Sequence, residues 1–75
     1  MNTIYRFFAG RTTGPARPSY GEAFQDAVDY IAARLSHPPK RVVIQRSAEH
    51  GWYTEAFVTV SAVVEALKMD ERPTV

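Results

Sequence analysis

Cysteine is absent from this chain of 75 residues. Neither a disulfide framework nor a thiolate zinc site can therefore stabilise the fold, and the absence is typical of the reducing interior of the cell. We expect a cytoplasmic protein that is held together by packing alone.

A long apolar run is also missing. No stretch approaches the ~20 apolar residues that cross a bilayer, and residues 1–6 lack the basic-then-apolar order of a signal peptide. The start at Met1 favours a complete soluble chain, with no membrane contact.

An excess of charge of one sign is the third absence. Nine basic residues face eight acidic ones, giving a formal net charge of +1. A general affinity for nucleic acid is therefore not expected, and such a role would need a local basic patch. Residues 1–75 should form a single compact domain, which at this size would gain stability from a dimer interface or another partner.

The first part of the chain predicts a strand followed by a loop. Residues 3–9 are aromatic and β-branched, which fits a half-buried strand. Residues 10–18 are rich in glycine and proline, so we expect a flexible basic loop. Arg11 and Arg17 lie near the start of the next helix, where the loop could hold a phosphate. The glycine spacing is not that of a phosphate-binding loop, so a connector with solubilising arginines is the favoured interpretation.

The clearest element is a helix that starts after Ser19. Ser19 and Glu22 have the spacing of a capping box. Apolar residues then follow the helical period as far as Leu35, and the helix must end before His37, because two prolines follow.

Residues 41–47 and 52–60 predict a hairpin around His50 and Gly51. With those two residues at the centre of the turn, Arg46 lies opposite Glu55 and Ile44 opposite Phe57.

A last helix is expected over residues 62–69, capped by Ser61, before a polar C-terminal tail at 70–75. A right-handed crossover from the first strand through the first helix would then place both helices on one sheet face. The fold class is α+β, a two-layer α/β sandwich of β-α-β-β-α order with a three-stranded mixed sheet.

Both faces of the predicted strands carry apolar side chains. In the hairpin, Ile44, Tyr53 and Phe57 alternate with Val43, Trp52, Ala56 and Val58. A sheet with one solvated face should alternate more cleanly. The uncovered face is therefore expected to meet a partner or a second copy, giving a homodimer, unless the second helix and the long loop cover it.

Catalytic and metal-binding patterns are not found. The two histidines lack ligand spacing, no serine lies in a nucleophile elbow, and so we expect no enzyme, no cofactor and no metal site.

We therefore expect a small non-enzymatic protein-interaction module. Its size suggests, by analogy, a phage or mobile-element inhibitor that occludes a host defence complex. Three aromatic and three acidic residues are the predicted partner-binding set: Trp52, Tyr53, Tyr5, Glu22, Asp26 and Asp29. The three acidic residues share one helical face that could meet a basic groove on a partner, although a charged helical face is more often simply exposed to solvent.

The alternative function is binding of single-stranded nucleic acid. Arginines interleave with aromatic residues, as on sheets that stack bases and hold phosphates. The predicted residues for this function are Arg6, Arg11, Arg17, Arg41 and Arg46.

Overall fold

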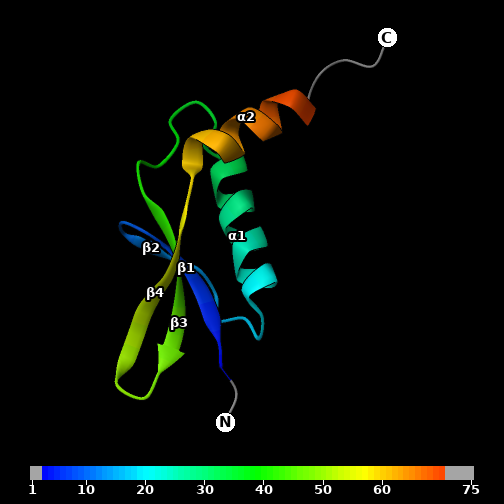
Figure 1. Ribbon diagram of the computed structural model, residues 1–75. Coiled ribbons are helices and arrows are strands. Elements are labelled where there is room, and N and C mark those ends of the chain that lie inside the picture. The colour runs from blue at the N-terminus through cyan, green and yellow to red at the C-terminus, as the bar shows by residue number, and fades with distance from the viewer. Residues whose placement is uncertain (1–2, 71–75) are drawn as a thin grey trace.

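The computed structural model describes residues 3–70 and contains four strands and two helices. The strands are β1 (Tyr5–Ala9), β2 (Thr12–Thr13), β3 (Val42–Ala48) and β4 (Gly51–Val58). The helices are α1 (Tyr20–Ala32) and α2 (Val60–Asp70). The class is α+β, as predicted, and the order is β-β-α-β-β-α (Figure 1).

The sheet has four strands in the order β2-β1-β3-β4, and all neighbours are antiparallel. The prediction of a three-stranded mixed sheet was wrong on both counts. The cause lies in residues 10–18, which run back along β1: Gly14 N donates to Phe7 O at 2.9 Å, and Arg17 N to Tyr5 O at 2.7 Å.

This return path decides the direction of every later element. The chain enters α1 at the end of the sheet where β1 began, so α1 runs in the same direction as β1 (Figure 1). β3 then returns in the opposite direction and pairs antiparallel with β1. The right-handed crossover rule concerns parallel strands and does not apply to this connection.

α1 forms as its sequence predicts. The Ser19 hydroxyl accepts from Glu22 N at 3.2 Å and donates to the Glu22 carboxylate at 3.0 Å. The helix is shorter than predicted, because residues 33–37 tighten into turns. Its buried stripe of Ala23, Ala27 and Ile31 packs on one face of the sheet.

α2 does not lie over the sheet as predicted. It packs on α1 and crosses the upper end of that helix (Figure 1). Only Thr59 separates β4 from α2, so the chain has no length to turn back over the sheet. Thr59 O accepts from Val63 N at 3.1 Å, so Thr59, and not Ser61, precedes the helix.

The hairpin turns at residues 49 and 50, so its predicted register was wrong. Arg46 lies opposite Tyr53, and Ile44 lies opposite Ala56. Gln45 pairs with Thr54, so Glu55 is an extra residue on β4 that forms a bulge.

The bulge changes which β4 side chains reach the core. Beyond Glu55 the alternation is shifted by one residue, so Val58 joins the core beside Val42 while Phe57 lies beside Val43 on the other face. The predicted faces of Ala56, Phe57 and Val58 were thus all wrong.

The predicted C-terminal tail at 70–75 lies outside the described residues, apart from Asp70, where α2 ends.

Candidate binding face

The side of the sheet that faces away from α1 is called the open face below. Cross-strand pairing and the contacts of the core assign the following side chains to it: Arg6, Phe8, Val43, Gln45, Trp52, Thr54 and Phe57, with Arg41 just before β3. No helix of residues 3–70 covers this side (Figure 1).

At the hairpin end of the open face, an arginine stacks on a tryptophan. The Arg6 guanidinium carbon lies 3.9 Å from the centre of the Trp52 ring, and Arg6 Nε donates to Gln45 Oε1 at 2.8 Å. The Trp52 ring is partly covered by this contact. The guanidinium is thus oriented before any ligand arrives.

At the other end, three apolar residues form a row across β1, β3 and β4. Phe8, Val43 and Phe57 are cross-strand neighbours. Val43 is only 5 % exposed although it faces away from α1, whereas Phe57 is 67 % exposed. The Arg41 guanidinium lies 5.5 Å from the Phe57 ring. This end is therefore a small apolar centre beside a cation.

The structure does not bring the three predicted aromatic residues together. Trp52 is on the open face, whereas Tyr5 and Tyr53 lie on either side of Arg46 on the face of α1. The Tyr5 ring is 6.1 Å from that of Tyr20. Tyr53 is 52 % exposed although it lies on the face of α1.

Arg46 and Glu55, predicted to lie opposite each other, are instead diagonal neighbours that still form an ion pair of 2.9 Å. The pair is about half exposed, and it joins the inner strand β3 to the edge strand β4 on the face of α1. Arg46 is therefore not part of the open face.

The predicted acidic residues of α1 are engaged within the chain. Glu22 accepts from the capping serine, and Asp29 accepts from Gln25 at 3.0 Å. Asp26 accepts two bonds from Arg17, at 2.7 and 3.1 Å. This hydrogen bonding, together with the negative charge of Asp26, raises the pKa of the Arg17 guanidinium. Arg17 thus fastens the 10–18 segment to α1, away from the open face.

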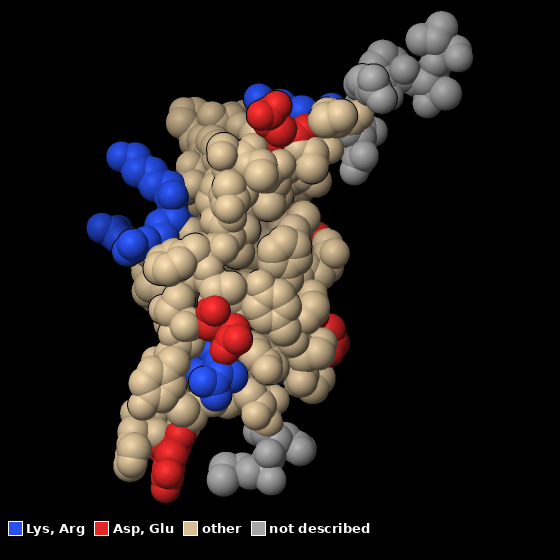
Figure 2. All heavy atoms as spheres, in the orientation of Figure 1, with Lys and Arg blue, Asp and Glu red and all other residues tan. Residues whose placement is uncertain are grey.

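Cations gather on one side of the molecule, although ion pairs such as Arg17–Asp26 and Arg46–Glu55 place both signs elsewhere. Figure 2 shows Lys and Arg side chains extending from the side where β2 lies, and Asp and Glu side chains at the edge beside α1. Within residues 3–70, no Asp or Glu of a strand is assigned to the open face, whose cations are Arg6 and Arg41. Arg11 is exposed at the β1–β2 turn. The open face therefore favours an anionic ligand.

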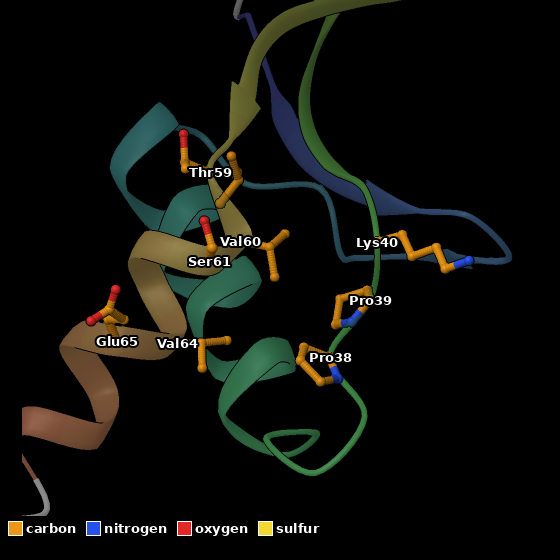
Figure 3. A pocket seen from close by; sticks show the side chains of 9 residues that line it. Pro38, Pro39, Lys40, Thr59, Val60, Ser61, Val64 and Glu65 are labelled. Carbon is orange, nitrogen blue, oxygen red and sulfur yellow. The ribbon is translucent and has the colours of Figure 1, made fainter.

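Two hollows adjoin the upper end of the sheet and share Pro39 and Lys40 in their walls. The larger, about 630 Å³, lies between Pro38–Pro39 and the first turns of α2, where Val60 and Val64 form its wall (Figure 3). The smaller, about 420 Å³, lies between the end of β1 and the start of β3. It continues the open face, because Phe8 and Arg41 belong to both.

Comparisons with family models, curated proteins and solved structures give no match.

Sequence reasoning placed Phe57 on the wrong face, and it grouped Lys40 with the other basic residues without locating it beside a hollow. Phe57 was assigned to the side of Ile44 because period-two alternation was carried through a bulge that no glycine or proline marks. The sequence shows Lys40 only as one of the basic residues near aromatic ones, because its position at the two hollows depends on how residues 33–41 return to the sheet.

Across residues 3–70, no helix has the length and apolar character needed to cross a membrane. In the same range, no three His, Asp or Glu side chains gather closely enough to hold a metal ion.

Proposed function

We propose that this chain is a non-enzymatic binding module whose open face docks on a protein partner. The observation that carries the proposal is the environment of Phe57: a large aromatic side chain, 67 % exposed, beside Arg41 on a sheet face with no assigned carboxylate.

The anatomy of the face supports a protein partner. Protein interfaces have an apolar centre with a polar rim, and they are enriched in aromatic residues and Arg. Here Phe8, Val43 and Phe57 form the centre, and Arg6 and Arg41 flank it. A complementary surface would offer an apolar side chain between carboxylates.

The interior supports a non-catalytic role. Among the described residues, no polar or charged side chain is buried. Acids and bases used in catalysis are commonly tuned by burial in a cleft, and an exposed group gains no such tuning.

Single-stranded nucleic acid is the second candidate, and the Arg6–Trp52 stack favours it. Such sheets bind bases by stacking them on free aromatic rings. The open face has one large, mostly exposed ring, that of Phe57, since Arg6 lies over Trp52. We therefore rank this function below protein binding.

A role as an inhibitor belongs to the same proposal. A rigid domain that covers the docking surface of a larger host complex needs no chemistry of its own. A phage or mobile-element origin rests on analogy of size alone.

The test is affinity capture from bacterial lysates with two matched aromatic variants of β4. Phe57→Ser alters the open face, and Tyr53→Ser alters an exposed aromatic residue on the other face. We expect the wild type and Tyr53→Ser to retain a common protein, identified by mass spectrometry, that Phe57→Ser loses. Loss with Tyr53→Ser alone would refute docking through the open face.

A parallel titration with a labelled single-stranded oligonucleotide tests the second candidate. Phosphate contacts make affinity fall steeply as salt rises. Tight, salt-sensitive binding that Arg41→Ala weakens equally for all sequences would replace the protein-partner proposal.

A further inference from the structure

A hollow of about 420 Å³ lies at the upper end of the open face. It is lined by Phe8, Ala9, Gly10 and Pro39, called its floor below, and by the exposed Lys40 and Arg41, called its rim. The recess is at the small end of the ~300–1,000 Å³ range of ligand pockets, so it suits a side chain with its flanking backbone.

The charges of this recess favour an occupant with acidic groups. Both titratable residues in its wall are cations, and both side chains are exposed, so neither pairs with a buried acid. An apolar side chain would fill the floor, and carboxylates beside it would meet Lys40 and Arg41.

The charges of the larger hollow do not favour a ligand of one sign. Lys40 and Glu65, of opposite charge, stand at its two sides. Figure 3 shows Lys40 extending away from α2, so the two charges do not converge on one group.

We infer that the 420 Å³ recess is the anchor pocket for the partner, and that it takes an apolar side chain of a peptide segment flanked by Asp or Glu. This inference rests on the proposed function and specifies the chemistry of the partner. Phe57, beside Arg41, extends the same surface along the peptide.

The experiment begins with selection of a display library of random short peptides on the immobilised wild-type protein. We expect enriched sequences that place an acidic residue next to Leu, Ile, Met or Phe. Enrichment of peptides without acidic residues would overturn the inference.

The affinity of an enriched, fluorescently labelled peptide is then measured by anisotropy for two lysine variants. Lys40→Glu reverses a charge at the rim, and Lys68→Glu makes the same change on α2, where the side chain is also exposed. We expect Lys40→Glu to weaken binding by about tenfold or more, and Lys68→Glu to bind like the wild type. Equal affinity of Lys40→Glu and the wild type would contradict the pocket.

Phe57→Ser separates this inference from the proposed function. If Phe57→Ser lowers the affinity for the peptide and Lys40→Glu does not, the open face binds the partner but the anchor pocket lies elsewhere. If neither variant changes the affinity, both proposals fail. If no peptide is enriched and a single-stranded oligonucleotide binds in a manner that Lys40→Glu weakens, the rim recognises phosphate and the inference is wrong.

Amide shifts in NMR spectra locate the peptide directly. We expect the largest changes at residues 8–10 and 39–41, and changes confined to α1 would refute the pocket.

Discussion

Gly14 packs directly on the ring of Phe7, a side chain that is 5 % exposed in the core. Its N–H donates to Phe7 O, so the backbone of the 10–18 segment lies against β1 at this point. A Cβ at position 14 would collide with ring carbons Cδ2 and Cε2 of Phe7. Glycine is therefore required here by the close approach of two segments.

We expect Gly14→Ala to lower the free energy of unfolding by about 1–3 kcal/mol, because the added methyl group overpacks the core. Gly21→Ala is the matched control, since a Cβ there would meet nothing within 4 Å. Gly21 lies in α1, where alanine is favoured by about 0.5–1 kcal/mol. Urea unfolding followed by circular dichroism measures both changes. A Gly14→Ala variant as stable as the wild type would contradict the packing.

The same residue scale shows where reasoning from the sequence succeeds and where it fails. Ser19 and Glu22 were read correctly because a capping box is local. Phe57 was placed on the wrong face because one extra residue, Glu55, shifts the alternation. Its position depends on pairing with Val43, which no window of neighbouring residues contains.

At the scale of elements, α1 depends on its first turn. Ser19 satisfies Glu22 N, which has no partner within the helix. We expect Ser19→Ala to lower the free energy of unfolding by about 1 kcal/mol.

Ser61→Ala is the control for this prediction, because Ser61 lies inside α2 and is exposed. It should leave stability unchanged or raise it by less than about 0.5 kcal/mol, since alanine favours a helix. Thermal unfolding of both variants measures the two changes in stability. A larger loss from Ser61→Ala than from Ser19→Ala would show that the caps are assigned wrongly.

The elements themselves differ in how far their sequences determine them. α1 and both strands of the hairpin were predicted because a dense local pattern marks each one. β2 was missed because Thr12 and Thr13 pair with β1 through only two residues in a glycine-rich stretch. The reversal at residues 10–18 in turn sets the direction of β3, so one short segment led to the error in sheet type.

At the scale of the whole molecule, the open face separates Arg6 and Arg41 from the carboxylates, although the net charge is only +1. The carboxylates of α1 lie on the other side of the sheet, where Asp26 pairs with Arg17. This separation explains why composition alone did not reveal a basic surface.

The separation also bears on the homodimer that the sequence allowed. Two copies that met symmetrically through their open faces would oppose two surfaces whose assigned charges, Arg6 and Arg41, are all positive, and like charges disfavour that contact. We therefore expect a monomer at low salt.

Salt should change this balance in a predictable direction. At roughly 0.5 M salt the Debye length is shorter than at roughly 0.05 M, so repulsion between the cationic faces weakens while apolar contact through Phe57 does not. Sedimentation velocity should thus show more self-association at the higher salt concentration, and Phe57→Ser should abolish the increase. Tyr53→Ser should not, because that residue is on the other face. A dimer that forms at low salt and dissociates as salt is added would instead indicate pairing of the open face with the acidic side of α1.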